Sequence, residues 1–176
     1  MDIRDELERC IRTVPDFPIP GIQFRDITPV LADPALMKRI AESFAESVAE
    51  TKPTAVAGPE ARGFIFGPLL AAQLGCPFIP IRKPGKLPSE TVSVAYELEY
   101  GTNTLEMHKD ALVDEDRVII VDDLLATGGT VQAAISLIEG TGAQTVGTCF
   151  VIELIGLNGR GKIEPIPVHS LIALPA

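Results

Sequence analysis

Residues 118–130 read VIIVDDLLATGGT, and this stretch decides the fold that the sequence predicts. An apolar, mostly β-branched run leads into two carboxylates, Asp122 and Asp123, and then into a loop of small residues that opens a helix. Such an apolar run is typical of a buried parallel strand. Gly128 and Gly129 allow a tight turn in which backbone N–H groups approach a ligand closely. At the start of a helix, those N–H groups favour an anion.

The two aspartates narrow the kind of anion that this loop is expected to bind. Ionised carboxylates only accept hydrogen bonds, so they repel a phosphate but suit ribose hydroxyls or a magnesium ion beside it. The stretch therefore predicts a ribose phosphate, with the sugar against Asp122 and Asp123. The alternative is an ordinary strand-to-helix turn with a solvated Asp pair. The spacing of Thr127 and Thr130 around the glycines disfavours that alternative.

Length and composition predict one compact domain, residues 1–176, with 46% hydrophobic and 22% charged residues. The net charge of -9 argues against broad nucleic-acid binding, which needs a basic surface. The N-terminus is charged and lacks the apolar core of a signal peptide. The uncharged run 63–81 is interrupted by glycines and prolines, which argues against a membrane span. Three scattered cysteines are typical of buried thiols in a reducing cytoplasm, so we expect a cytoplasmic protein.

Predicted strands and helices alternate along the middle of the chain, which indicates an α/β fold with a mainly parallel, twisted sheet flanked by helices. The predicted strands are Thr54–Ala57, Pro77–Ile81, Arg117–Val121 and Thr145–Ile152, and the helices between them include Gly63–Leu74 and Thr130–Glu139.

Two further segments lie outside this alternation. Residues 1–33 are predicted to hold a first helix, capped by Asp2, and a Pro-rich loop from Pro15 to Gly21. Within residues 84–108, apolar and polar residues alternate from Val92 onward and turn at residues 101–103, which predicts a hairpin arm.

Basic side chains follow two neighbouring strands of the predicted sheet. Ligands of open α/β sheets bind at the carboxyl ends of the strands, so these side chains are expected near the ribose phosphate. They indicate a second anion site next to the first, and they are Arg62, Arg82, Lys83 and Lys86.

A second glycine-rich segment, Gly156–Lys162, has the Gly and Lys spacing of a nucleoside-triphosphate loop. Ile163 stands where that loop has a magnesium-binding hydroxyl, and the prolines at 165 and 167 disfavour the helix that should follow. We therefore interpret this segment as a surface turn.

Several motifs together resemble the adenine phosphoribosyltransferases within the type I phosphoribosyltransferase family. The likeness runs from about Pro15 to about Glu153 and rests on FPIPG at 17–21, FRDI at 24–27, ARGF at 61–64, RKPGKLP at 82–88, LEYG at 98–101 and the stretch quoted first. It implies a reaction of adenine with phosphoribosyl pyrophosphate that gives AMP and pyrophosphate in purine salvage, with Mg²⁺ as cofactor. It also implies a homodimer, an N-terminal base-covering segment at 1–33 and a flexible hairpin lid at 84–108.

The resemblance also implies a role for each matching residue. The 5-phosphate is expected at Ala126, Thr127, Gly128, Gly129 and Thr130, and the ribose hydroxyls at Asp122 and Asp123, which are also the candidate metal ligands, directly or indirectly. Pyrophosphate is expected at Arg62, Arg82 and Lys83, and the base at Phe24, Arg25 and Leu124. Lys86 and Tyr100 belong to the lid, and Glu99 and Arg62 are the candidate catalytic residues.

Two other functions stay open on the sequence. A phosphoribosyl-binding regulator would keep the ribose loop without catalysis, but it usually adds a DNA-binding module and a basic surface. A transferase for xanthine or another oxo-purine usually reads the 6-oxo group with a Lys or Asp from a C-terminal segment, whereas residues 169–174 are largely apolar.

Overall fold

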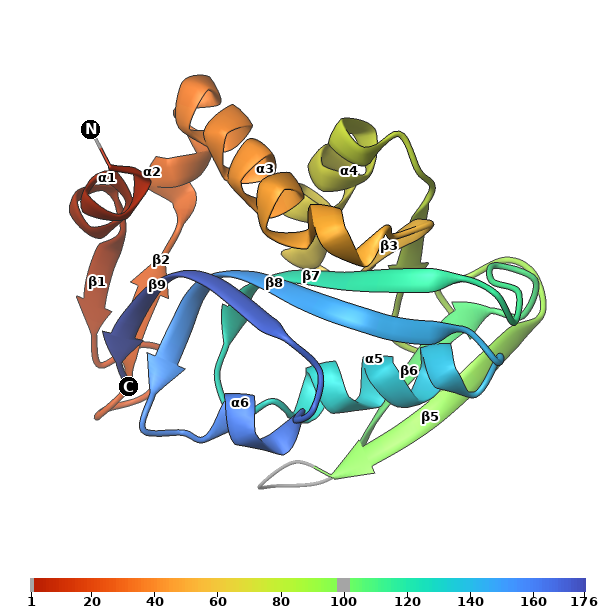
Figure 1. Ribbon diagram of the computed structural model, residues 1–176. Helices are drawn as coiled ribbons and strands as arrows, with labels where there is room; N and C mark the ends of the chain where they lie inside the picture. Colours follow the sequence, from red (N-terminus) through yellow and green to blue (C-terminus); the bar gives the residue numbers. More distant parts are fainter. Residues whose placement is uncertain (1, 98–101) are drawn as a thin grey trace.

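The computed structural model describes residues 2–97 and 102–176. Its centre is a five-stranded sheet in the order β4-β3-β7-β8-β9 (Figure 1). Every neighbouring pair in this sheet is parallel, so the predicted α/β fold is confirmed. The five strands are β3 (Ala55–Pro59), β4 (Phe78–Ile81), β7 (Arg117–Leu125), β8 (Gln144–Ile155) and β9 (Val168–Pro175).

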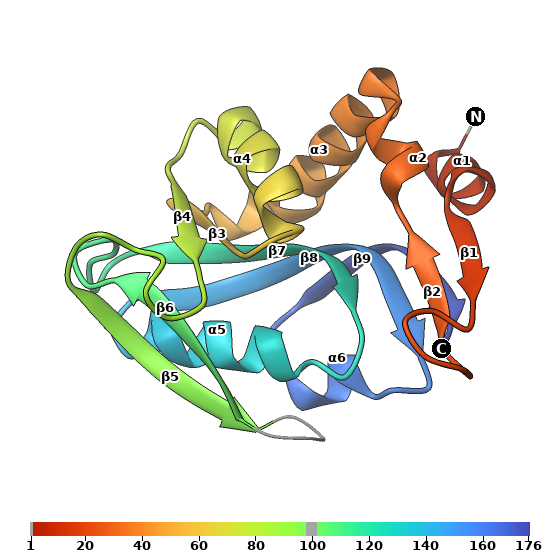
Figure 2. The same ribbon diagram turned by 180° about the vertical axis from the view of Figure 1, so that it is seen from behind.

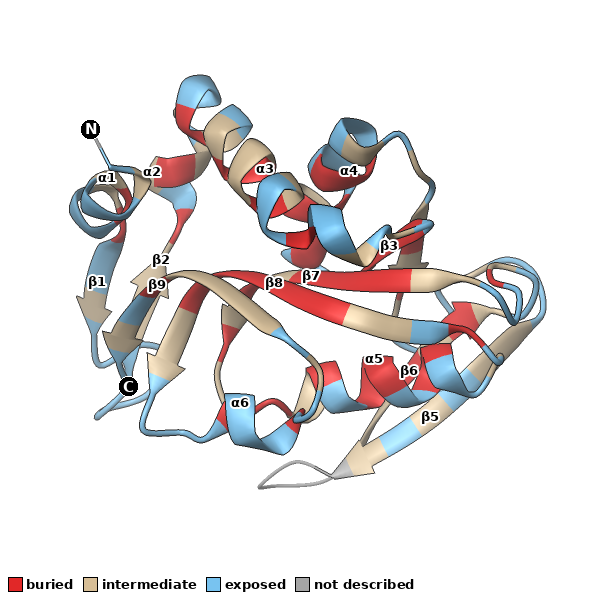
Figure 3. Ribbon diagram, in the orientation of Figure 1, coloured by how far each residue is buried: buried red, intermediate tan, exposed pale blue. Residues whose placement is uncertain are grey.

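Helices cover both faces of the sheet. α3 (Pro34–Val48) and α4 (Gly63–Leu74) lie on one face, while α5 (Gly129–Glu139) and the short α6 (Gly159–Lys162) lie on the other (Figure 1). The sheet is therefore buried between two apolar layers, and its middle strands β3, β7 and β8 are largely buried (Figure 3). This arrangement explains the apolar run of β7, because a strand covered on both faces has no solvent side.

The N-terminal segment forms a helix and an antiparallel ribbon beside the end of β9. α1 (Ile3–Cys10) begins after Asp2, whose side chain accepts a hydrogen bond from the N–H of Arg4, as predicted. β1 (Arg12–Pro15) pairs with β2 (Gln23–Asp26), and α2 (Thr28–Leu31) leads to α3. The ribbon was not predicted, because its strands have only four residues each. Pro15, expected in the loop, is the last residue of β1 instead.

A second antiparallel pair, β5 (Thr91–Glu97) and β6 (Thr102–His108), confirms the predicted hairpin and lies beside α5 (Figure 2). The expected turn at residues 101–103 was wrong for two of its members. Thr102 and Asn103 lie in β6 and pair with Glu97 and Tyr96. The pairing register of the hairpin decides their conformation, and Thr is a favourable strand residue.

Further elements also differ from the prediction. β7 continues past Val121 to Leu125, because its pairing with β8 extends through Asp122 and Leu124. The predicted turn at Gly156–Lys162 contains α6, and β9 was not predicted at all. The end of α3 passes through a 3₁₀ turn, Ala49–Thr51, before β3. Among the helices of residues 2–97 and 102–176, none combines the length and apolar character that crossing a bilayer requires.

Candidate functional site

The carboxyl ends of β3 and β7 meet at one edge of the sheet. The two strands are parallel neighbours, with Ala57 opposite Ile120, so the segments that follow them open on the same side. After β3 come Glu60–Arg62 and the first turn of α4. After β7 come Ala126–Thr130, called here the β7–α5 loop. The fold thus brings the two predicted anion sites together.

An ion pair joins the two strand ends. Arg62 precedes the first residue of α4, and its Nε donates a hydrogen bond to Oδ2 of Asp123 at 2.5 Å. The Asp123 side chain is 5% exposed, whereas that of Arg62 is 48% exposed. A guanidinium has five N–H donors, so Arg62 keeps donors on its solvent side that can meet a ligand.

Asp122 completes a cluster of two carboxylates and one guanidinium. Its Oδ1 accepts a hydrogen bond from the backbone N–H of Asp123 at 2.8 Å. Burial raises the pKa of Asp122 well above its usual range, and the charge of Asp123 raises it further. The backbone N–H of Asp123 and, to a smaller extent, Arg62 offset only part of this rise. The cluster therefore favours a ligand that brings hydroxyl donors or positive charge to these oxygens.

The same carboxylates fit a magnesium ion in one particular way. In the described parts of the chain, no three His, Cys, Asp or Glu side chains gather as a metal-binding group. Mg²⁺ usually binds through one or two carboxylates together with substrate phosphates and water. Two carboxylates beside an anion-binding loop match that donor set, which relies on the substrate for the remaining oxygens.

The β7–α5 loop presents the start of α5 to solvent. Gly128 precedes α5 in a left-handed conformation, with φ of 79°, and no side chain caps the helix at this position. The first N–H groups of α5 therefore stay available for an anion. A Cβ added to Gly128 would lie 2.8 Å from the backbone oxygen of Gly159, so glycine is required there. A Cβ added to Gly129 would meet nothing closer than 3.9 Å.

The second basic group, after β4, is partly occupied by protein contacts. Nε of Arg82 donates to Oε2 of Glu60 at 2.6 Å, Nη1 donates to the backbone oxygen of Lys86, and the guanidinium lies 5.7 Å from the centre of the Phe64 ring. Burial alone would raise the pKa of Glu60, but the hydrogen bond and charge of Arg82, together with the backbone N–H of Lys83 and the charge of Lys86, outweigh it and lower the pKa. Lys83 and Lys86 are exposed.

Phe24 and Arg25 lie on β2, and Leu124 lies half-buried near the end of β7. Arg25 donates from Nη1 to Oγ1 of Thr13 at 2.6 Å and from Nη2 to the backbone oxygen of Pro175 at 2.7 Å. Its side chain thus fastens the β1–β2 ribbon to the end of β9. Glu99 and Tyr100 lie outside the described residues.

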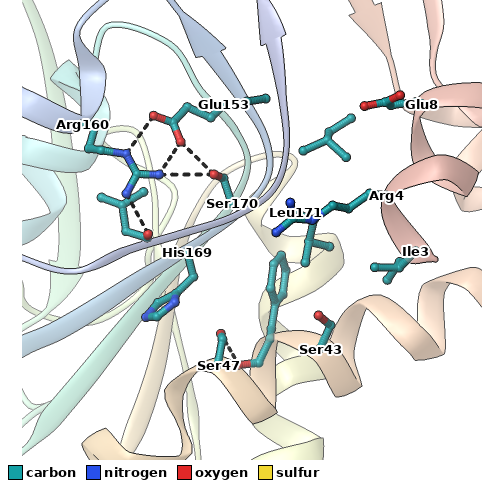
Figure 4. Close-up of a pocket in the computed structure, with 14 residues that line it drawn as sticks. Ile3, Arg4, Glu8, Ser43, Ser47, Glu153, Arg160, His169, Ser170 and Leu171 are labelled. Atoms are coloured by element: carbon teal, nitrogen blue, oxygen red, sulfur yellow. Dashed lines mark hydrogen bonds and ion pairs between the residues drawn. The ribbon is translucent and has the colours of Figure 1, made fainter.

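A cavity of about 680 Å³ lies away from these residues, between α1, α3 and β9 (Figure 4). Sequence reasoning missed the network at its edge, in which Glu153 accepts from Arg160 and from the hydroxyl of Ser170. It also missed the Glu60–Arg82 pair and the approach of the Tyr96 hydroxyl to Oγ1 of Thr130, 3.4 Å. The partners in these contacts are distant in sequence or lie on different elements, so no local sequence pattern predicts them.

Comparison with known proteins gives consistent matches. Residues 27–166 match the model of the phosphoribosyl transferase domain. Adenine phosphoribosyltransferase of Francisella philomiragia is 55% identical over 170 residues, 96% of this chain and 97% of the relative. The crystal structure of the enzyme of that name from Thermoanaerobacter pseudethanolicus superposes with a TM-score of 0.94 at 50% identity, covering 97% of this chain and 99% of the other. The Saccharomyces cerevisiae enzyme, solved with adenine and an imino-altritol bisphosphate, gives a TM-score of 0.91 at 41% identity and covers 97% and 98%.

Proposed function

This chain belongs to the phosphoribosyl transferase family, and we propose that the ends of β3 and β7 form the site at which it makes AMP. The reaction transfers the 5-phosphoribosyl group of phosphoribosyl pyrophosphate to adenine and releases pyrophosphate, a step of purine salvage. The observation that carries this proposal is the junction of Arg62 with Asp123, directly before a loop whose N–H groups are free for a phosphate.

The described residues divide the substrate between them. The N–H groups of the β7–α5 loop hold the 5-phosphate, and Asp122 and Asp123 accept hydrogen bonds from the ribose hydroxyls. Arg62 and Lys83 meet the pyrophosphate. Arg82 supports that site by holding Glu60, and it reaches pyrophosphate only if it releases that partner. Lys86 follows this group at the base of the hairpin.

Charge development explains why these residues suit the reaction. The bond from the anomeric carbon to pyrophosphate breaks with its electron pair on the leaving group, and the bond from adenine N9 to that carbon forms. Positive charge grows on the ribose ring, where the carboxylates of Asp122 and Asp123 stabilise it, while Arg62 stabilises the departing anion. Glu99, on the lid with Tyr100, accepts the proton that N9 loses, directly or through water.

We propose Mg²⁺ as the cofactor, with Asp122 and Asp123 as its protein ligands or as partners of its bound water. The ion would neutralise negative charge on the pyrophosphate.

Adenine binding is proposed at Phe24, Arg25 and Leu124. Adenine presents an amine donor beside an N1 acceptor, and the 6-oxo purines present the reverse pattern. Because the Arg25 side chain is bonded to Thr13 and Pro175, the backbone of β2 is the part of this segment that reads the base. A 6-oxo purine would leave the polar backbone groups of β2 unpaired, which should favour adenine over that purine by roughly a thousandfold.

We also propose that the chain forms a homodimer. In each single-domain chain, residues 84–108 form the lid and residues 1–33 form the base-covering segment.

A base-competition assay tests the proposed reaction. The purified chain is given phosphoribosyl pyrophosphate, Mg²⁺ and equal concentrations of adenine, hypoxanthine, guanine and xanthine. We expect AMP as the dominant product. Equal use of hypoxanthine or xanthine would overturn the adenine assignment, and binding of phosphoribosyl pyrophosphate without any product would favour the regulator.

A further inference from the structure

We propose that Lys162 binds the 5-phosphate of the substrate, an inference that rests on the function proposed above. Lys162 is the last residue of α6, within the glycine-rich segment that we interpreted from the sequence as a surface turn. This segment is far from β7 in the chain. In the structure it lies against the β7–α5 loop.

Direct contact between backbones joins α6 to this loop. A Cβ added to Gly159 would lie 2.2 Å from the backbone oxygen of Ala126, and one added to Gly128 would lie 2.8 Å from the backbone oxygen of Gly159. Side chains at either glycine would separate the two segments. Gly159 is therefore explained by close packing, and the packing fixes α6 beside the phosphate-binding loop.

The contact places the ammonium group of Lys162 at the start of α5. Its Nζ lies 3.9 Å from the position that a Cβ on Gly129 would take. Lys162, Gly129, Tyr96 and Gln132 line one cavity of about 350 Å³. Within residues 2–97 and 102–176, Lys162 forms no ion pair. Its charge is therefore not neutralised by any described carboxylate.

The charges around the loop explain what Lys162 adds. Residues 126–130 offer N–H groups and hydroxyls but no cationic side chain, and two aspartates precede them in a chain of net charge -9. A phosphate monoester carries almost two negative charges at neutral pH. A charged donor forms a hydrogen bond about twice as strong as a neutral one. Lys162 therefore supplies the positive charge that the β7–α5 loop lacks.

Binding of AMP and of adenosine separates this role from a purely structural one. The two ligands share base and sugar, and only AMP has the 5-phosphate. Calorimetric titration of the wild-type chain, Lys162→Met and Lys162→Arg is compared with Lys38→Met, a control on α3 where Lys38 pairs with Glu42 at 3.6 Å. In Lys162→Met we expect AMP to bind about tenfold more weakly, which is ~1.4 kcal/mol, with adenosine unchanged. Lys162→Arg should restore most of the loss, and high salt should reduce the difference.

Three outcomes would overturn the inference. Equal AMP affinity in Lys162→Met and the wild-type chain would remove Lys162 from the phosphate site. An equal weakening of AMP and adenosine would assign Lys162 to the packing of α6 instead. A wild-type chain that binds no AMP would overturn the proposed function as well, so the two failures are distinguishable.

Discussion

Two charged clusters, one around Glu153 near the carboxyl end of β8 and one at the carboxyl ends of β3 and β7, differ in how their charges are balanced. At β8 and β9, Glu153 accepts hydrogen bonds from Nε and Nη2 of Arg160 at 3.0 and 2.5 Å and from the Ser170 hydroxyl at 2.7 Å. At β3 and β7, two adjacent carboxylates share the single guanidinium of Arg62. In the first cluster, the carboxylate is neutralised by a guanidinium. In the second cluster, two carboxylates face one guanidinium, so one negative charge has no matching positive charge.

We propose that this difference separates charges that stabilise the fold from charges that bind substrate. A buried carboxylate without enough partners destabilises the folded chain, so its presence calls for a ligand that supplies the missing donors. A matched cluster needs nothing more. The comparison predicts that substitutions at β3 and β7 change catalysis, whereas those at β8 and β9 change stability.

The largest effect is expected at the unbalanced end. Asp123→Asn and Asp122→Asn remove the negative charge that we propose faces the ribose, so kcat/KM for phosphoribosyl pyrophosphate should fall by about a hundredfold or more. Adenine binding should change little. Steady-state kinetics with each substrate varied in turn measure both. If both variants kept the wild-type kcat/KM for phosphoribosyl pyrophosphate, the two carboxylates would have no catalytic role, and the contrast between the two clusters would not hold.

A substitution at Gly128 is expected to weaken the binding of phosphoribosyl pyrophosphate to a comparable degree and also to destabilise the fold. Gly128→Ala puts a side chain at positive φ and against the backbone of Gly159, and should destabilise the folded state by about 1–3 kcal/mol while weakening donor binding. Gly129→Ala is the matched control, since its Cβ has room. Thermal melting with and without phosphate tests the pair. Equal melting temperatures for the two variants would contradict the requirement for glycine at position 128.

A smaller effect, confined to stability, is expected at the balanced end. The hydrogen bond from Arg160 lowers the pKa of Glu153, so this carboxylate stabilises the fold above its unfolded pKa and loses that contribution as the pH falls through its folded pKa. Glu153→Gln should cost about 1 kcal/mol at pH 7, a modest value because Arg160 is half exposed, and the difference from wild type should disappear in acid. Denaturant unfolding at both pH values measures it. A fall in kcat/KM would contradict the assignment.

The smallest effect concerns the interior of β8. Burial raises the pKa of the Cys149 thiol to about 12, so it stays protonated and unreactive in the folded chain. We expect iodoacetamide at pH 8 to modify Cys10 and Cys76 before Cys149, as mass spectrometry of timed samples would report. Early labelling of Cys149 would mean that β8 opens readily, against a rigid structural role for this strand.

The elements with strong sequence patterns were predicted. The elements that depend on pairing with other strands were not. The helix Gly63–Leu74 and the apolar run of β7 are continuous and well bounded, so their positions were confirmed. The ribbon β1–β2 and strand β9 are short or at an edge, and their pairing decides them more than their composition does. Within the site, Arg62 and the aspartates were predicted to lie together. That Arg25 would bond to Pro175, and Arg82 to Glu60, depends on distant elements that only the fold brings close.

The contact between Gly128 and Gly159 also bears on where the chain can be shortened. A protein cut after Ile155 would keep strands β3, β4, β7 and β8, together with every residue that the family motifs supply. It would nevertheless lose the backbone wall on which the β7–α5 loop rests. Nothing else among the described residues approaches Gly128 from that side as closely. The last segment of the chain is therefore no dispensable tail, and a minimal version of this domain has to retain it.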